Sequence, residues 1–588
     1  MFAAVRLTAR RITRVSRATI HPVAAWLRVC ATLFRYPFAD ASGPANIRSA
    51  IFSVVVLSCL VLCGLNIYGV AKQTWQTSDS VQSFLEAQSI LHRNFLLSGW
   101  RLSSDSYIFT DTPFFVIYER LFGARPEALI VVPSIIYVLI IAACLAASLR
   151  SLKPSRHNIA ALATIVLLVG LPSLRPPSIH LFSPATPILL ADHHAASILF
   201  SLVALMLLAV LARAGRIRDR WGVASMLVLV WAATLASDPF TLFFAFGPAI
   251  LVLLGDLVLF RHKTKQSSLV IITISASILG IIIPMLLYRL GGPAVEDTVG
   301  LRFAGPKDFI INIQAMFFGF LYSADAYIFG KELWSTETLA HLFRLSGWIL
   351  GAAFILWNLP RLKRHWKGSL FDRILIASIA TLTLACILSE QFAFGLASDV
   401  FDGGEGRIYI SPLIILGAVL AARAVPTVEA RLPMKTLRSV ARNGLVVLAA
   451  GLLILQFPRA LTLARSPAWV RNNPYVEISQ WLEARHLTHG IGEYWVSTII
   501  RALTDGQVSV NAVVAGSGGR LEPYVFDTDA HFFRAGDTPM FVIWRAGDDP
   551  FNWYGVNPDT VKATYGPPVS VERLPGGFEI EILRETPN

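Results

Sequence analysis

The sequence has few charged residues and few cysteines. Only 15% of its 588 residues are charged, while 54% are hydrophobic; an ordinary soluble domain has about 25% charged residues. This shortage of charge excludes a soluble cytosolic enzyme, a disordered protein and a fibrous repeat. The five cysteines form neither a CxxC pair nor a Cys/His zinc spacing, and the stretch 459–588 contains none. That C-terminal stretch is therefore not held together by disulfides.

Long apolar runs are abundant. A helix needs about 20 apolar residues to cross the hydrocarbon core of a bilayer, and the sequence offers eleven candidates, several of them short. Runs of this kind exclude an outer-membrane barrel, whose strands are short and alternate in polarity. The sequence thus predicts a polytopic α-helical membrane protein. The predicted spans lie at about 50–71, 128–148, 158–174, 194–212, 222–236, 240–260, 268–288, 341–358, 373–390, 408–424 and 443–458.

The basic residues are concentrated in alternate loops. The chain has 51 Lys and Arg against 38 Asp and Glu, which gives a net charge of +13. Residues 1–48 carry eight arginines and a single acid, Asp40, and every second loop after them is also basic, whereas the intervening loops are acidic or mixed. Because cytoplasmic loops are rich in Lys and Arg, we expect a cytoplasmic N-terminus, a C-terminus outside, and no nucleic-acid partner.

The N-terminal arm, 1–48, has too long a basic region for a cleaved signal peptide, so segment 50–71 is predicted to be a signal anchor. Within the arm, residues 22–34 fit either an amphipathic helix on the inner leaflet or a frayed basic tail. We expect a multi-pass protein of the bacterial inner (plasma) membrane.

The C-terminal stretch, 459–588, differs from the rest in its pattern. It mixes polar turns with short strand-like runs, and two of its segments have apolar residues at helical spacing. A small soluble α/β domain is therefore predicted after a transmembrane domain at 49–458, and the count of spans places it in the periplasm. The predicted strands are Val508–Val514, Met540–Trp544 and Phe578–Leu583, and the predicted helices are Tyr475–Leu487 and Tyr494–Leu503.

The first outer loop, 72–127, is long and carries an acid near its start. From Asp79 onward, apolar residues at helical spacing predict a helix lying on the outer membrane surface, and Pro113 suits the first turn of a second one. Asp79 with Gln82 three residues later fits a capping box, so a helix cap is one interpretation of this acid. A general base is the other, and the two roles are compatible.

This layout resembles the GT-C superfamily of integral membrane glycosyltransferases, which use sugars linked to polyprenyl phosphates. The resemblance rests on one span, a long outer loop that opens with an acid and carries surface helices, many further spans, and an outer C-terminal domain. The family often shows a paired acid in this loop, whereas this chain has Asp79 followed by Ser80. The resemblance implies that Asp79 takes the proton from an acceptor hydroxyl while polyprenyl phosphate departs from the other face of the sugar, with inversion.

The resemblance also implies a second functional acid in the loop between the third and fourth predicted spans. Asp192 matches that position and is a candidate to bind the acceptor or a divalent cation, Mg²⁺ or Mn²⁺, with His193 and His180 as neighbours. Two adjacent histidines on a regular helix point about 100° apart, so His193 and His194 are not expected to hold one metal together. The alternative interpretation is that Asp192 only caps the following helix.

A donor of this class carries a phosphate, which calls for a basic partner at the outer membrane edge. Arg407 follows a flexible glycine-rich segment and precedes a span, where its guanidinium fork suits phosphate oxygens; the alternative is an interfacial arginine that snorkels. Lys331 and Arg289, in the long outer loop 289–340, are further candidates for the donor phosphate. Arg344 and Lys307 are rivals from the same region.

Two other acidic motifs have simpler interpretations. Asp238, in a Ser-Asp-Pro sequence between closely spaced spans, is expected to be a turn residue. Asp527-Thr528-Asp529 has the form of the metal-binding DxD motif of nucleotide-sugar transferases, but nucleotide sugars are not expected outside the membrane, so we expect an ordinary loop.

The leading hypothesis is a membrane glycosyltransferase that moves a sugar from a polyprenyl-phosphate donor to a periplasmic glycan, lipid or protein. The alternative is a transporter or flippase of a lipid-linked glycan precursor, which predicts charges at mid-membrane; the predicted spans have almost none at their centres. An acyltransferase and a scaffold without enzymatic activity fit the sequence less well.

Overall fold

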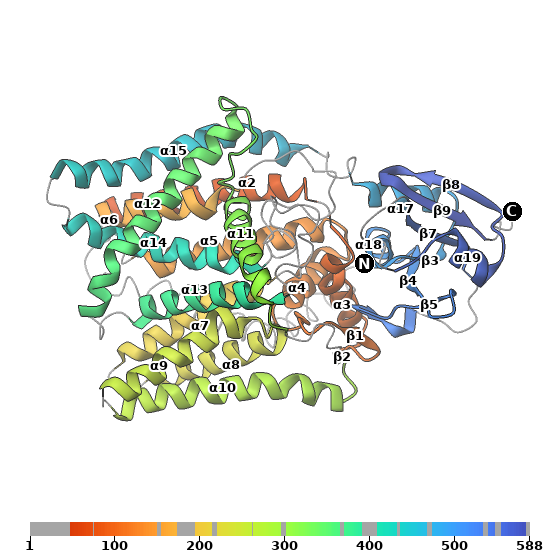
Figure 1. Ribbon diagram of the computed structural model, residues 1–588, viewed down its shortest axis with the longest axis horizontal. Helices are drawn as coiled ribbons and strands as arrows, with labels where there is room; N and C mark the ends of the chain where they lie inside the picture. Colours follow the sequence, from red (N-terminus) through yellow and green to blue (C-terminus); the bar gives the residue numbers. More distant parts are fainter. Residues whose placement is uncertain are drawn as a thin grey trace, which may run out of the picture.

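The computed structural model consists of a helical bundle and a strand-containing domain attached at one end of it (Figure 1). Between them lie elements of the segment that follows the first long helix. The structure describes residues 47–74, 76–149, 155–172, 194–214, 220–260, 263–295, 302–364, 370–390, 409–431, 435–466, 473–532, 539–546 and 554–583.

The bundle contains helices in roughly parallel or antiparallel array, while α12 (Thr336–Arg364) runs obliquely to them and α11 (Pro306–Ser323) runs across their direction (Figure 1). The array consists of α2 (Ile47–Ala71), α5 (Ala128–Ser148), α6 (Arg156–Ile165) with its π-helical continuation η3 (Val166–Gly170), α7 (Ala195–Arg213), α8 (Trp221–Ser237), the π-helical η6 (Leu242–Phe246) with α9 (Gly247–Phe260), α10 (Lys263–Arg289), α13 (Leu370–Leu388), α14 (Ser411–Arg431) and α15 (Lys435–Arg465).

Among the described residues, seven helices are long and apolar enough to cross a membrane, and four more are apolar but shorter. These eleven segments correspond in position to the eleven predicted spans, so the prediction of a polytopic helical membrane protein is confirmed. The seven are Ser49–Ala71, Ala128–Ser148, Ala195–Arg213, Gln266–Arg289, Thr336–Pro360, Leu370–Leu388 and Arg442–Arg465, and the four are Arg156–Gly170, Trp221–Ser237, Leu242–Val258 and Ser411–Val425.

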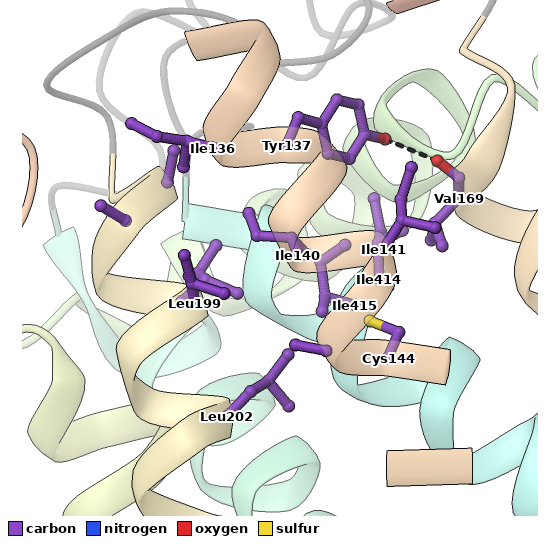
Figure 2. Packing of buried hydrophobic residues seen from close by; sticks show 14 of the residues in the cluster. Ile136, Tyr137, Ile140, Ile141, Cys144, Val169, Leu199, Leu202, Ile414 and Ile415 are labelled. Atoms are coloured by element: carbon purple, nitrogen blue, oxygen red, sulfur yellow. Dashed lines mark hydrogen bonds between the residues drawn. The ribbon is translucent and has the colours of Figure 1, made fainter. Parts of the chain in front are cut away.

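Helix α5 forms the centre of the bundle. Its most apolar window is 78% buried, against 22% for α2 and 28% for α15, so α2 and α15 leave apolar surface for lipid. Figure 2 shows α5 side chains such as Ile140 packed between Leu199 of α7 and Ile415 of α14. The Tyr137 hydroxyl donates to the carbonyl oxygen of Val169 at 2.9 Å, which satisfies a backbone group that the π-helical turn leaves open (Figure 2).

A buried ion pair joins two other bundle helices. Arg373 of α13 donates two hydrogen bonds to the carboxylate of Asp256 in α9, one of them at 2.8 Å. Both side chains are at most 9% exposed. A buried bidentate pair of this kind fixes the register of α9 against α13.

The segment between α2 and α5 carries the 3₁₀ turn η2 (Asp79–Val81), α3 (Gln82–Leu91), β1 (Trp100–Leu102) and α4 (Thr112–Phe122). Both expected helices of this loop are present. Strand β1 pairs in parallel with β2 (Ala294–Val295) and antiparallel with β6 (Thr528–Asp529). This small sheet therefore joins the first loop to the end of α10 and to the C-terminal domain.

The C-terminal domain is built on a six-stranded sheet of order β5-β4-β3-β7-β9-β8. Its elements are α17 (Pro474–Ala484), β3 (His489–Gly492), α18 (Tyr494–Leu503), β4 (Ser509–Ala515), β5 (Leu521–Pro523), β7 (Phe541–Arg545), α19 (Pro558–Tyr565), β8 (Ser570–Leu574) and β9 (Phe578–Ile582). Strand β3 is parallel to both neighbours. A Cβ at Gly490 would lie 2.4 Å from the ring of Phe541, so only glycine permits this close packing. The predicted α/β character is confirmed.

Candidate functional site

Asp79 lies where the first loop meets the C-terminal domain. It begins η2, eight residues after the end of α2, and its side chain is half-buried. The hydroxyl of Tyr494, the first residue of α18, donates to Asp79 Oδ1 at 2.5 Å. An acid from the first loop and a tyrosine from the C-terminal domain thus meet directly, although 415 positions separate them in the chain.

A second hydrogen bond fixes the same contact through the backbone. Ser78 Oγ donates to the Tyr494 carbonyl oxygen at 2.5 Å, and Thr498 Oγ1 donates to the Ser78 carbonyl oxygen at 3.4 Å. Ser78 and Tyr494 are both fully buried. The turn that carries Asp79 is therefore docked on the first turn of α18 by side-chain and main-chain groups.

Burial raises the pKa of the Asp79 carboxyl to about 6, and the hydrogen bond from Tyr494 offsets part of that rise. Tyr494 lies within an aromatic cluster, with ring centroids 5.8 Å from Tyr524, 5.5 Å from Phe526 and 6.1 Å from Tyr554. Burial and the nearby Asp79 charge hold the pKa of the Tyr494 hydroxyl well above its ordinary value, so this group stays a donor.

The expected capping box at Asp79 is not formed. Neither η2 nor α3 has a side-chain hydrogen bond to its N-terminal amides. Gln82 instead donates to Glu86 Oε1 at 2.9 Å within α3. The capping interpretation of Asp79 is therefore wrong, because the C-terminal domain competes for its carboxylate.

A second polar cluster contains Asp105, His194 and Asp238. Each offers one ligand atom, and these atoms lie within 4.8 Å of one another. His194 Nδ1 is 2.8 Å from Asp238 Oδ2. Asp105 comes from the first loop, His194 directly precedes α7, and Asp238 ends α8. His194 also has a left-handed backbone (φ 64°), a conformation that costs energy in non-glycine residues and is concentrated at functional sites.

The charged groups of this cluster shift one another's pKa values. Burial alone would lower the pKa of His194, but the Asp238 carboxylate, together with Asp105 and Asp111, raises it to about 9. Burial and repulsion from Asp238 raise the pKa of Asp105 to about 7, against the opposing effect of His194. Without a bound cation, this arrangement favours a protonated His194 between the carboxyl groups of Asp105 and Asp238.

Aromatic rings surround His194. Its ring centroid lies 5.9 Å from Tyr107, 4.8 Å from Phe240 and 5.8 Å from Tyr409. Tyr409, just before α14, and Tyr107 of the first loop therefore lie on the same histidine ring.

One short stretch of the first loop joins the two clusters. Asp527 Oδ1 accepts a hydrogen bond from the Ser103 amide at 2.7 Å, two residues before Asp105. Asp527 also lies close enough to Tyr494 to affect its pKa. The Asp527–Asp529 motif thus belongs to the interface with the first loop: Thr528 and Asp529 pair with β1, and Asp529 Oδ1 lies 2.7 Å from His531 Nδ1.

The other predicted site residues are distributed differently. His180, Asp192, His193 and Arg407 lie outside the described residues. Arg289 is exposed at the end of α10, near the contact of Ser98 Oγ with the Gly291 carbonyl oxygen at 2.5 Å. Lys331 donates to Glu337 and lies 3.3 Å from His341 Nε2. Within the described part of the chain, neither Arg289 nor Lys331 is in contact with Asp79.

A small polar cavity lies deeper in the bundle, beside Tyr137. It measures about 20 Å³, room for one water molecule. Asp325 and Arg344 line it, with Arg344 Nη1 3.9 Å from Asp325 Oδ2. Arg344, which the sequence offered as a rival phosphate partner, is thus almost fully buried beside an acid.

Sequence reasoning missed three members of these clusters. Asp105 was one acid among several in its loop, Asp238 was interpreted as a turn residue, and Tyr494 was only the start of a predicted helix. Asp238 does end a helix, but its carboxylate also faces His194. An isolated acid at the end of an apolar span was the signal that could have identified it.

No protein-family model matches the sequence, and no curated protein matches it. Solved structures do match. ArnT from Cupriavidus metallidurans in the apo state is 11% identical, with a TM-score of 0.50 over 92% of this chain and 100% of that one. The same protein bound to undecaprenyl phosphate is 11% identical, with a TM-score of 0.48 over 93% of this chain and 100% of that one. An Archaeoglobus fulgidus oligosaccharyltransferase, in complex with Zn and sulfate, is 13% identical, with a TM-score of 0.41 over 83% of this chain and 68% of that one. The apo ArnT match shows that this chain shares the fold of that structure, a helical membrane domain followed by a strand-containing C-terminal domain.

Proposed function

We propose that this chain is a membrane glycosyltransferase of the GT-C type, which moves a sugar from a polyprenyl-phosphate donor to a glycan, lipid or protein acceptor. The proposal begins from the shared fold. It includes the topology expected from the loop charges: an inner (plasma) membrane protein with a cytoplasmic arm, 1–48, a transmembrane domain, 49–458, and a periplasmic domain, 459–588.

The placement of Asp79 is the observation that carries the proposal. Its carboxylate occupies the loop position where the resemblance implies a general base, and it is half-buried against the C-terminal domain. A pKa of about 6 leaves it ionised at neutral pH while keeping it basic enough to accept a proton. A helix cap would not require this environment.

In the proposed reaction, the acceptor hydroxyl transfers its proton to Asp79 as its oxygen attacks the anomeric carbon. The bond from that carbon to the phosphate oxygen breaks on the opposite face, so the configuration inverts and polyprenyl phosphate leaves. A carboxylate held in one orientation contributes about 10²–10⁴-fold to such a step. Arg407, Lys331 and Arg289 remain the proposed partners of the donor phosphate.

A divalent cation is a proposed cofactor, and the Asp105, His194 and Asp238 cluster fits one. Two carboxylates suit Mg²⁺ or Mn²⁺, and the imidazole nitrogen favours Mn²⁺ of these two. A bound cation would supply positive charge near developing negative charge. The chain's own part is to hold the three ligand atoms within 4.8 Å of one another, on three different elements.

The test is release of the lipid carrier. Purified protein is reconstituted in vesicles with synthetic undecaprenyl-phosphate monosaccharides that carry a radiolabelled sugar, together with an envelope extract as acceptor. Transfer predicts that label leaves the lipid and that free undecaprenyl phosphate appears in equal amount. A flippase would instead expose intact labelled lipid on the other leaflet without releasing the phosphate, and that result would overturn the proposal.

A further inference from the structure

We propose that Tyr494 is a positioning residue for Asp79, so that the C-terminal domain supplies part of the catalytic site. The inference rests on the proposed function of Asp79 as the base. It assigns the domain a mechanical role that is separate from recognition of any acceptor.

The contact is built to hold one orientation. The Tyr494 hydroxyl donates to Asp79 Oδ1 at 2.5 Å, while its own carbonyl oxygen accepts from Ser78 Oγ at 2.5 Å. One residue of α18 therefore holds two successive residues of the turn. Tyr494 is held through both its ring hydroxyl and its backbone carbonyl oxygen. The turn that carries Asp79 and the start of α18 are therefore fixed to each other as a unit.

The surroundings keep the Tyr494 ring in place. Tyr494 is 1% exposed, and its ring packs against Trp495 at 5.1 Å as well as against Tyr524, Phe526 and Tyr554. A buried hydroxyl that loses its acceptor leaves a donor unsatisfied, which is costly. Tyr494 thus has a strong preference for the geometry that points at Asp79.

The contact gives the two carboxylate oxygens of Asp79 different roles. Oδ1 accepts the tyrosine hydroxyl. Oδ2 then has a fixed direction in which to meet an acceptor hydroxyl, and a general base is effective only within hydrogen-bond reach of the proton it takes. Without Tyr494, the carboxylate would be free to rotate about its side-chain bonds.

The contact also sets the protonation state of the base. Burial disfavours the charged form of Asp79, and the tyrosine hydrogen bond favours it. The ionisable groups around this pair are Tyr524, Tyr554, whose pKa Asp79 also raises, Asp527, and Glu493, which acts on Tyr554. None of these is a cation, so the Tyr494 hydroxyl is the stabilising partner of the carboxylate among the described residues.

The experiment compares Tyr494→Phe with wild type in the lipid-carrier assay across pH 5–8. The variant keeps the ring and removes the hydroxyl, which stabilises the charged carboxylate, so the midpoint of the acidic limb should move up by about one to two pH units. Tyr475→Phe is the matched control, because Tyr475 is also fully buried in the same domain and packs on Phe578, away from Asp79. An unmoved midpoint in Tyr494→Phe, or an equal shift in the control, overturns the inference.

Thermal unfolding gives a readout that does not need sugar transfer. In a double-mutant cycle of Tyr494→Phe and Asp79→Asn, the loss of Tm caused by Tyr494→Phe should be larger at pH 8 than at pH 5 when Asp79 is present. It should not depend on pH when Asn replaces Asp79. If wild type transfers no sugar but the cycle behaves so, the proposed function fails while the contact and its charge dependence stand. If the two residues show no coupling at either pH, the inference fails whatever the activity.

Discussion

His194 and Asp238 form a buried charged pair, with Nδ1 of the imidazole 2.8 Å from Oδ2 of the carboxylate. His194 precedes the first residue of α7 and Asp238 follows the last residue of α8, so each stands at the end of an apolar helix. Asp105 completes the cluster from the first loop. A charge near a membrane is retained where it has a partner or a ligand.

Replacement of Asp238 by Asn should weaken the binding of Mn²⁺ to this cluster. We expect wild type to gain Tm on addition of Mn²⁺, because a ligand that binds only the folded state stabilises it. The variant should need a concentration more than about tenfold higher, since even outer-shell partners of a metal contribute about 10–100-fold. Asp559→Asn, an exposed acid on α19, is the control. Equal Mn²⁺ responses in all three proteins would place the ion elsewhere.

Replacement of Asp79 by Asn should remove sugar transfer while the protein remains folded. The amide keeps the size of the side chain but cannot take a proton, so a loss of about 10²–10⁴-fold in kcat is expected. The measurement is release of polyprenyl phosphate, with circular dichroism and Tm as folding checks. Asp559→Asn again serves as the control. Turnover at the wild-type level would exclude Asp79 from the mechanism.

The sequence predicted the bundle well because apolar length is a strong signal. Segments such as 128–148 and the helix Tyr494–Leu503 were predicted with the bounds found in the structure. Amphipathic periodicity reveals which residues face a core, and it needs no knowledge of partners.

Partnerships across the chain were beyond the reach of periodicity. Asp79 was placed in a capping box because Gln82 stands at the right local distance, but its hydrogen bond goes to Tyr494 at a separation of 415 positions. Asp105, His194 and Asp238 come from three elements whose spacing in sequence follows no metal-binding motif. Rules based on local sequence spacing cannot show whether an acid will bond to a nearby amide or to a distant hydroxyl. Such sites can therefore be recognised only once the fold brings their residues together.

Glu119 should make the protein less stable as the pH rises. Its side chain in α4 is 5% exposed, and within the described residues neither carboxylate oxygen has a hydrogen-bond partner. Burial, together with the charge of Asp505 in the C-terminal domain, raises its pKa from 4.5 to about 8. Between these two values the folded state holds a proton that the unfolded state has released, so the free energy of unfolding falls as the pH rises through this window.

Glu119→Gln removes this ionisation and should raise Tm above wild type, with the gain small near pH 5 and largest at pH 8 or above. A stabilisation on the order of 1–3 kcal/mol is expected from relief of a buried, unpaired charge. Glu127→Gln is the matched control, since Glu127 is exposed in the same loop. A gain that is the same at every pH would mean that Glu119 acts through packing and not through its charge.

The Asp256–Arg373 pair should be a sensitive polar contact inside the bundle. Asp256→Asn removes the carboxylate that faces the buried Arg373 guanidinium, so we expect a destabilisation of about 3–5 kcal/mol. The double variant Asp256→Leu with Arg373→Met removes both charges and should recover most of that loss, because apolar groups of similar size suit a buried site between α9 and α13. Unfolding in mixed detergent, followed by circular dichroism, measures both variants. A double variant that is as unstable as Asp256→Asn would show that the pair holds the two helices through its hydrogen-bond geometry, beyond the balance of its charges.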